Sequence, residues 1–252
     1  MASVEHLPEI HEPEVRSDIP AGPPPRFDRV AHLYRIMEYL SFGPMLERCR
    51  YHYIAAIARS RPAPKRALVL GDGDGRFLAR LLAAAPHLHA DAIEASPAML
   101  RLLRARIARL GAQSRLTTTC ADARTFAPSS TGYDLVCTHF FLDCLTALEA
   151  NHLIAQIRPH LMPGAQWLVS EFQIPSGSPL PAWLARAIVS ALYAAFRLLT
   201  GLTVRQIPPW TALLSKHGFR PKSTHASLGG LLVSELWEVP QATASRAPRS
   251  HS

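Results

Sequence analysis

Three glycines, Gly71, Gly73 and Gly75, follow a short apolar run at residues 67–70 and alternate with two aspartates. Glycine allows a backbone to turn sharply and to approach a ligand closely, and a strand–loop–helix unit presents that ligand at the carboxyl edge of a parallel sheet. A dinucleotide-binding loop, GxGxxG, would need glycine where this chain has Arg76. The shorter GxGxG spacing is typical of loops that hold a methionine sulfonium cofactor. The alternative is a tight turn in an unrelated strand–helix unit.

Acidic residues stand at the ends of the next two predicted strands. Glu94 ends the run 90–94, nineteen residues after the last glycine, and a carboxylate there can accept hydrogen bonds from both hydroxyls of a ribose. Asp122 follows the run 116–120, and we expect it to accept a hydrogen bond from an adenine amino group while the backbone of Ala121 and Ala123 contacts the ring. The alternatives are a solvated glutamate at a strand end and an Asx turn that closes the next strand.

His139 and Asp143 lie in the otherwise apolar segment that follows the fourth predicted strand. Either side chain could accept or orient the proton of a bound acceptor, which is the task of a general base. Tyr34, on a predicted helix near the N-terminus, is a third candidate. The alternative roles are structural: Asp143 would cap the next helix, and His139 would be a half-buried side chain with its hydrogen bonds satisfied.

Together, the glycine loop, Glu94, Asp122 and the segment YDLVCTHFFLDCL resemble the class I S-adenosylmethionine-dependent methyltransferases over residues 64–237. The resemblance implies that the glycines pack against the methionine part of the cofactor, that Glu94 binds the ribose and that Asp122 binds the adenine. The family usually has an acidic residue two places before the first glycine, where this chain has Val69. We therefore expect Asp72 or Asp74 to meet the methionine ammonium group. The other cofactor contacts expected are Ala95, Ser96, Met99, Ala121, Ala123 and Thr138.

A narrower resemblance concerns both ends of the predicted domain. FDRVAHLYRIMEYLSFG resembles the N-terminal segment of the ubiquinone/menaquinone biosynthesis C-methyltransferases, with Arg35 where that family has aspartate, and LLSKHGFRPKSTHASLGGLLVSELWEV resembles its final segment. The resemblance implies methyl transfer from S-adenosyl-L-methionine to a small, hydrophobic, quinone- or lipid-like acceptor. Two rivals stay open: a noncatalytic interaction or regulatory module with the same fold, and an RNA methyltransferase, which the positive charge alone suggests.

Predicted strands alternate with predicted helices, which is typical of crossover units and a parallel sheet. The strands lie at 67–70, 90–94, 116–120, 133–140 and 166–172, the helices at 76–85, 97–110, 146–160 and 210–217, and a terminal hairpin at 222–226 and 231–239. We therefore expect an α/β fold with a Rossmann-like, doubly wound, seven-stranded and mostly parallel sheet. An antiparallel C-terminal edge strand and N-terminal helices at 27–40 and 45–58 would complete it.

We expect one methyltransferase domain at residues 27–240, between a disordered arm at 1–26 and a disordered tail at 241–252. A helical cap at 27–60 and a lid-like insertion at 175–210 would decorate that domain. Within the insertion, the apolar stretch 182–199 predicts a lid over an apolar substrate or a helix lying in a membrane interface. Plain core packing is the alternative.

Charge, cysteines and hydropathy limit the classes of partner. The net charge of +8 comes almost wholly from arginine, which indicates either an anionic partner or only an arginine-rich composition. The four cysteines lack the spacing of a zinc site or a disulfide framework, so no metal is expected. The sequence contains neither a secretory signal nor an uninterrupted apolar run of about 20 residues. We expect a cytoplasmic protein with a small apolar substrate, no nucleic-acid partner, and at most peripheral contact with the inner face of a membrane.

Overall fold

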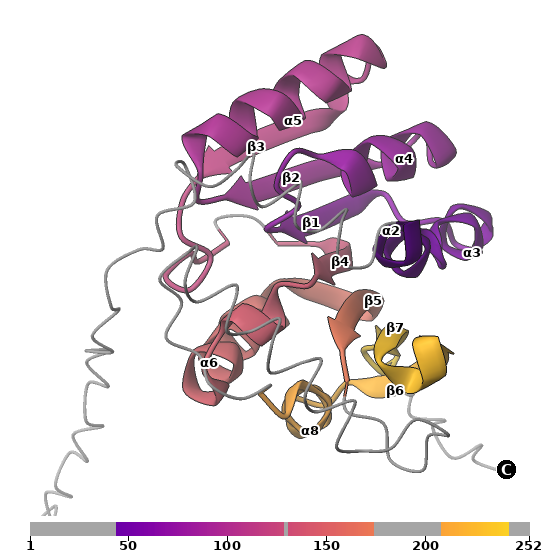
Figure 1. Cartoon of the computed structure of the whole chain (residues 1–252), viewed down its shortest axis with the longest axis vertical. Coiled ribbons are helices and arrows are strands. Elements are labelled where there is room, and N and C mark those ends of the chain that lie inside the picture. The colour runs from indigo at the N-terminus through magenta and orange to yellow at the C-terminus, as the bar shows by residue number, and fades with distance from the viewer. Residues whose placement is uncertain (1–43, 129–130, 174–207, 242–252) are drawn as a thin grey trace, which may run out of the picture.

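The computed structural model of this chain describes residues 44–128, 131–173 and 208–241. Its strands form one seven-stranded sheet in the order β3-β2-β1-β4-β5-β7-β6 (Figure 1). They are β1 (Arg66–Leu70), β2 (His89–Glu94), β3 (Leu116–Cys120), β4 (Tyr133–His139), β5 (Leu161–Phe172), β6 (Arg220–Ser227) and β7 (Leu232–Glu238). The chain progresses outward in one direction from β1 and in the other from β4. The carboxyl ends of β1 and β4 therefore form the switch point at which such sheets bind ligands.

Strands β1 to β5 run parallel, and β7 is antiparallel to both β5 and β6. This arrangement confirms the predicted mostly parallel sheet with an antiparallel C-terminal strand. That strand lies one place inside the edge, because the terminal hairpin leaves β6 outermost. Exposed Arg220 and Lys222 on β6 discourage another chain from pairing with this edge.

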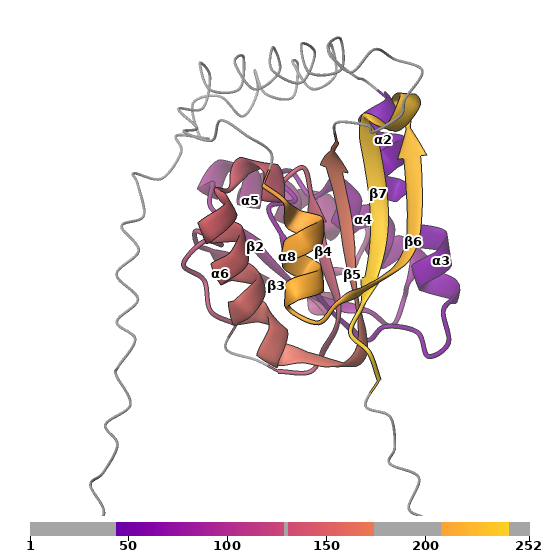
Figure 2. The ribbon, with the colours of Figure 1, turned by 90° about the horizontal axis from the view of Figure 1, so that it is seen from below.

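Helices cover both faces of the sheet (Figures 1 and 2). The first layer buries side chains such as Ile57, Leu78 and Leu103 against the sheet, and the second buries Ile154 and Leu214. Apolar residues at helical spacing create these faces, and their burial holds the three layers together. The first layer holds α2 (Pro44–Tyr51), α3 (Ile54–Arg59), α4 (Arg76–Ala84) and α5 (Pro97–Arg109), and the second holds α6 (Ala147–Ile157) and α8 (Trp210–Lys216).

Two helices differ from their predicted form, and the β3–β4 connection has no helix at all in its described residues. The helix predicted at 45–58 is interrupted at His52-Tyr53, where Tyr53 is buried and its hydroxyl donates to Oγ of Ser223 over 2.9 Å. The helix predicted to reach residue 160 ends at Ile157, because Pro159 has no N–H to donate to the preceding turn. Residues 121–128 and 131–132, between β3 and β4, contain no helix, so other contacts must hold this crossover in place.

Some predicted segments lie outside the described residues. They are the arm at 1–26, the first part of the helical cap with Tyr34, the insertion up to residue 207 with its apolar stretch 182–199, and the tail from residue 242. Within the described ranges, no helix has the length and hydropathy needed to cross a membrane.

Candidate functional site

The loop between β1 and α4 has all three glycines in the left-handed region, with φ of 65° at Gly71, 60° at Gly73 and 77° at Gly75. A Cβ on Gly71 would lie 2.5 Å from Cδ2 of Phe141, and a Cβ on Gly75 would lie 2.7 Å from Cγ of Leu103. A Cβ on Gly73 would meet no described atom within 4 Å. The loop is therefore tightly packed at both ends and open in the middle, where a ligand can approach its backbone.

Glu94 connects this loop to the next strand–helix junction. Its Oε2 accepts a hydrogen bond from the N–H of Gly73 at 3.0 Å, and its Oε1 accepts one from the N–H of Ser96 at 2.9 Å. Ser96 in turn caps α5, because its hydroxyl accepts from the N–H of Met99 at 3.2 Å. The two backbone donors fix the Glu94 carboxylate at the carboxyl end of β2.

The two aspartates of the loop have different partners. Asp74 is buried and accepts from Nε of Arg76 at 3.0 Å on one oxygen and from Nη2 of Arg106 at 2.9 Å on the other. Asp72 accepts from the N–H of Leu78, in the first turn of α4, at 2.9 Å. Loss of hydration raises the pKa of Asp72 to about 7, against the opposing effect of this hydrogen bond. Asp72 and Asp74 were both predicted to meet an ammonium group. Asp74 already forms ion pairs with Arg76 of α4 and Arg106 of α5, which leaves Asp72 as the better candidate.

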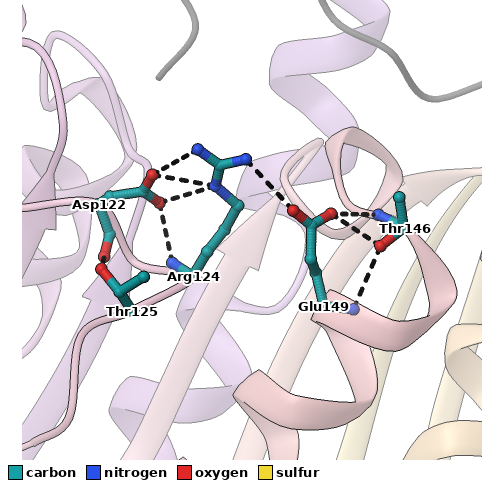
Figure 3. Close-up of polar contacts among 5 residues, drawn as sticks. All are labelled: Asp122, Arg124, Thr125, Thr146 and Glu149. Carbon is teal, nitrogen blue, oxygen red and sulfur yellow. Dashed lines mark hydrogen bonds and ion pairs between the residues drawn. The ribbon is translucent and has the colours of Figure 1, made fainter. Parts of the chain in front are cut away.

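Asp122 lies beyond the end of β3, where the Arg124 N–H donates to its Oδ1 at 2.9 Å. Figure 3 shows the Arg124 guanidinium lying against the same carboxylate. Burial acts to raise the pKa of Asp122, but the hydrogen bonds and charge of Arg124 hold it below its ordinary value. Asp122 therefore forms the Asx turn that was the alternative to its adenine-binding role. Ala121 and Ala123 flank it, the first partly exposed and the second buried.

The remaining predicted cofactor contacts divide by exposure. Ala95 is exposed and Met99 is partly exposed, so a ligand at this edge can reach them. Thr138 is fully buried, and its hydroxyl accepts from the indole N–H of Trp167 at 3.0 Å. The Thr138 side chain therefore belongs to the sheet core.

A buried carboxylate holds the segment that follows β4. Phe140 has a left-handed φ of 52°, and the N–H groups of Phe141 and Leu142 donate to Oε1 of Glu171 on β5 at 3.1 and 2.8 Å. Burial, together with the nearby carboxyl group of Asp143, raises the pKa of Glu171 well above its ordinary value. Asp143 and Glu171 thus form a buried carboxyl pair beside the carboxyl ends of β4 and β5.

Asp143 does not cap α6. Thr146 is the N-cap, because its hydroxyl accepts from the N–H of Glu149 at 3.2 Å while the Glu149 carboxylate accepts from the N–H of Thr146 at 2.8 Å. Asp143 instead lies buried in a short turn, where the thiol of Cys144 donates to its Oδ1 at 3.4 Å. The helix-cap alternative for Asp143 is therefore wrong.

His139 is enclosed rather than half-buried. Its ring packs against Phe77 with the ring centroids 4.0 Å apart, and its Nδ1 shares a hydrogen bond of 2.9 Å with the hydroxyl of Ser170. Its Nε2 is buried and has no hydrogen-bond partner among the described residues. Burial, and to a lesser degree the charge of Arg50, lowers the pKa of His139 well below its ordinary value. The ring is therefore neutral near pH 7.

Phe141, Arg124 and Glu171 belong to this edge of the sheet but were not predicted to do so. Glu171 carries a usable signal, because it is a charged residue inside the apolar run 166–172. Phe141 carries none, because its role depends on a contact with Gly71. Nothing local shows that Arg124, besides its bonds to nearby Asp122, also reaches Glu149, 25 residues away.

The geometry fits an adenosyl cofactor. The open space beside Gly73 and the carboxylates of Glu94 and Asp122 lie at or just beyond the carboxyl ends of β1, β2 and β3, which are neighbouring strands. A ligand lying across these ends would meet the glycine loop and the two carboxylates in turn. Among the described residues, no group of three or more His, Cys, Asp or Glu side chains is arranged to bind a metal.

Residues 67–164 match a family described as a methyltransferase domain. Among curated proteins, none matches this sequence. Three solved structures illustrate the similarity. The mitomycin 7-O-methyltransferase MmcR is 18% identical with a TM-score of 0.61, and the match covers 84% of this chain and 60% of that one. An O-methyltransferase family protein from Burkholderia thailandensis is 19% identical with a TM-score of 0.61, and the match covers 87% of this chain and 65% of that one. The N-methyltransferase NodS from Bradyrhizobium japonicum, in complex with S-adenosyl-L-homocysteine, is 16% identical with a TM-score of 0.57. That match covers 78% of this chain and 88% of NodS.

This chain spans 60–65% of the length of the first two of these proteins. The described residues have the Rossmann-like fold of S-adenosylmethionine-dependent methyltransferases. The match over residues 67–164 supports a methyltransferase domain in that range, and NodS, which has a similar fold, was solved with S-adenosyl-L-homocysteine bound. The narrower resemblance to the quinone-biosynthesis enzymes receives no specific support from these matches.

Proposed function

We propose that this chain transfers a methyl group from S-adenosyl-L-methionine to a small, hydrophobic acceptor. The observation that carries the proposal is the placement of Glu94, whose carboxylate joins the glycine loop to the start of α5 through the N–H groups of Gly73 and Ser96. A carboxylate fixed by two backbone donors presents a pre-organised acceptor to the ribose hydroxyls.

In this proposal each part of the cofactor has its own residues. The methionine part lies along the glycine loop with its ammonium group near Asp72, and the ribose is bound by Glu94. The adenine is recognised by Asp122 and contacted by Ala95, Ser96, Met99, Ala121 and Ala123. When bound, the cofactor supplies an electrophilic methyl group on sulfur. The protein's contribution is to position the acceptor and to exclude water.

Proton handling on the acceptor side is assigned first to Asp143. Burial and the neighbouring carboxyl group raise the pKa of Glu171 well above its ordinary value, and in this proposal Glu171 holds the proton of the pair while Asp143 is the carboxylate. A carboxylate there would accept the acceptor's proton as the methyl group is transferred. His139 is the second candidate, because its neutral ring has a buried Nε2 without a partner in the described part of the chain. Tyr34 is the third, and it lies outside the described residues.

A hydrophobic acceptor is supported by the apolar cluster beside this pair. Leu46 and Cys49 of α2 pack with Phe140, Phe172 and Leu232. Because Phe140 and Phe172 stand at the carboxyl ends of β4 and β5, we infer that the acceptor would lie beside this cluster. The resemblance to the quinone-biosynthesis C-methyltransferases agrees with such an acceptor, and the name of the similar mitomycin 7-O-methyltransferase agrees with a small-molecule one.

The RNA methyltransferase alternative draws on the arginines of α5, and two of these act within the domain. Arg106 binds Asp74 at 2.9 Å, and Nε of Arg104 donates to the hydroxyl of Thr118 at 2.8 Å. These contacts give the basic helix a role in stabilising the fold. A small-molecule acceptor is therefore preferred.

Calorimetric titration of the full chain with S-adenosyl-L-homocysteine tests the cofactor site. We expect saturable binding by the wild type and binding at least about tenfold weaker by Glu94→Gln, because the amide replaces one acceptor oxygen with a donor. Absence of binding by the wild type would favour a noncatalytic module with the same fold.

A further inference from the structure

Arg124 bonds to both the segment after β3 and the start of α6, which the chain connects only by way of β4. Its Nη2 lies 2.6 Å from Oδ2 of Asp122, beyond β3, and its Nη1 lies 3.2 Å from Oε1 of Glu149 (Figure 3). Glu149 is the third residue of α6 and forms a capping box with Thr146. Since the described part of the β3–β4 connection has no helix, this side chain supplies a direct link between the end of β3 and the start of α6.

The contacts of Asp122 leave limited room for another donor. A carboxylate offers about four lone-pair sites. Three N–H groups of Arg124 point at them: the backbone N–H toward Oδ1 at 2.9 Å, Nε–H toward both oxygens at 3.0 and 2.9 Å, and Nη2–H toward Oδ2. These are two contacts on each oxygen, so a further donor must share an oxygen with Arg124. Because all three donors belong to one residue, Arg124 fixes the plane of the carboxylate and the direction from which that further donor can approach.

The pair is also partly withdrawn from water. The side chains of Arg124, Asp122 and Glu149 are 16%, 27% and 18% exposed. Ion pairs on the open surface contribute little because water screens them and both side chains must be ordered. Here the short Asx turn and the planar guanidinium order both partners in advance.

We propose that Arg124 is a positioning residue that makes Asp122 selective for the 6-amino group of the cofactor's purine. This inference rests on the proposed function, in which Asp122 accepts a hydrogen bond from adenine. A carboxylate accepts from an amino group but repels the carbonyl oxygen that hypoxanthine carries at the same place. A loosely held aspartate could turn toward the N1–H of hypoxanthine and recover a hydrogen bond. Arg124 prevents that rotation.

The test compares S-adenosyl-L-homocysteine with its deaminated analogue, S-inosyl-L-homocysteine, by calorimetric titration of the full chain. We expect the wild type to bind the adenosyl compound at least about tenfold more tightly, the value of one good hydrogen bond. Arg124→Gln should reduce this ratio to within about threefold, as should Asp122→Ala, which removes the acceptor. Arg124→Lys keeps the charge but not the planar fork, so its ratio should lie between these values.

The matched control is Arg66→Gln. Arg66 pairs with Asp91 at 2.8 Å near the amino ends of β1 and β2, at the opposite end of the sheet. Its loss should lower the melting temperature as the loss of Arg124 does, and leave the binding ratio unchanged.

Three outcomes would overturn a claim. Wild-type ratios in both Arg124→Gln and Arg124→Lys, with a reduced ratio in Asp122→Ala, would overturn the role of Arg124 and leave the proposed function standing. If Arg124→Gln does not fold, the Arg124→Lys ratio alone decides. A wild-type ratio in Asp122→Ala would overturn both the adenine contact and the role of Arg124. Failure of the wild type to bind S-adenosyl-L-homocysteine would overturn the proposed function itself.

Discussion

The N–H of Gly73 donates a hydrogen bond to Oε2 of Glu94 over 3.0 Å, between residues 21 positions apart in the sequence. Gly73 lies at the open centre of the glycine loop, and Glu94 ends the neighbouring strand β2. The bond therefore fixes the place proposed for the methionine part of the cofactor relative to the place proposed for its ribose. The first prediction concerns the open side of this pair.

Gly73→Ala should abolish or strongly weaken cofactor binding at a modest cost in stability. Gly111 provides the matched control, because it also has a left-handed φ, 65°, and no described atom near the position of a Cβ. Each substitution should cost about 1–2 kcal/mol of unfolding free energy from the backbone conformation alone. Only Gly73→Ala should weaken binding of S-adenosyl-L-homocysteine, by about tenfold or more, because its methyl group fills the ligand's space. Equal affinities in the two variants would show that the ligand lies elsewhere.

Asp72→Asn should stabilise the fold more at high pH than at low pH. The pKa of Asp72 in the folded chain, about 7, lies above the ordinary value of 3.8, so folding favours the protonated carboxyl. The contribution of the protonated Asp72 carboxyl to the unfolding free energy is complete below pH 3.8. It is lost as the pH rises from there through 7, at up to about 1.4 kcal/mol per pH unit. Denaturant unfolding at pH 5 and pH 8 measures this. We expect the gain in unfolding free energy from Asp72→Asn to be larger at pH 8, and an equal gain at both would refute the assignment.

Cofactor affinity should depend on pH through the same residue. An ammonium group beside Asp72 favours the ionised carboxylate, so binding of S-adenosyl-L-homocysteine should tighten as the pH rises from 6 to 8. Asp72→Asn, which keeps an acceptor for the Leu78 N–H, should remove most of this dependence. Parallel pH profiles for the two proteins, measured by calorimetry, would exclude Asp72 as the partner of the ammonium group.

Asp143→Asn should lower turnover about a hundredfold, in the range typical of a lost general base, while cofactor affinity stays within about threefold of the wild type. His139→Ala is the companion variant, and we expect it to lower the melting temperature more than turnover, because the ring is packed against Phe77. Label transfer from S-adenosylmethionine gives the turnover. Near wild-type rates in both variants, with cofactor binding intact, would remove both residues from the mechanism.

Local sequence signals predicted the elements that carry the site. The apolar run before Gly71 and the acidic residue that ends the next strand depend on neighbours in the sequence, and the structure places both at the carboxyl edge of the sheet. The antiparallel terminal strand also followed from a short hairpin pattern, although its position inside β6 did not.

Contacts between distant segments could not be predicted in this way. The position of Asp74 in the loop predicts a contact with the ligand, but Asp74 forms an ion pair with Arg106, 32 residues later. Thr138 lies near the end of a strand, yet its hydroxyl accepts a buried hydrogen bond from the indole N–H of Trp167 on β5. The alternative to a catalytic role for His139 was a half-buried side chain, because nothing local in the sequence reveals that Phe77 and Ser170 enclose it.

The central claim is methyl transfer from S-adenosyl-L-methionine to a small hydrophobic molecule. The most direct measurement incubates the full chain with methyl-labelled S-adenosyl-L-methionine and an extract of lipids and metabolites, and follows label into organic solvent. We expect the wild type to form a labelled small molecule and Glu94→Gln to form little or none. Equal labelling by the two proteins, or no labelled product from a wild type that binds the cofactor, would contradict the claim.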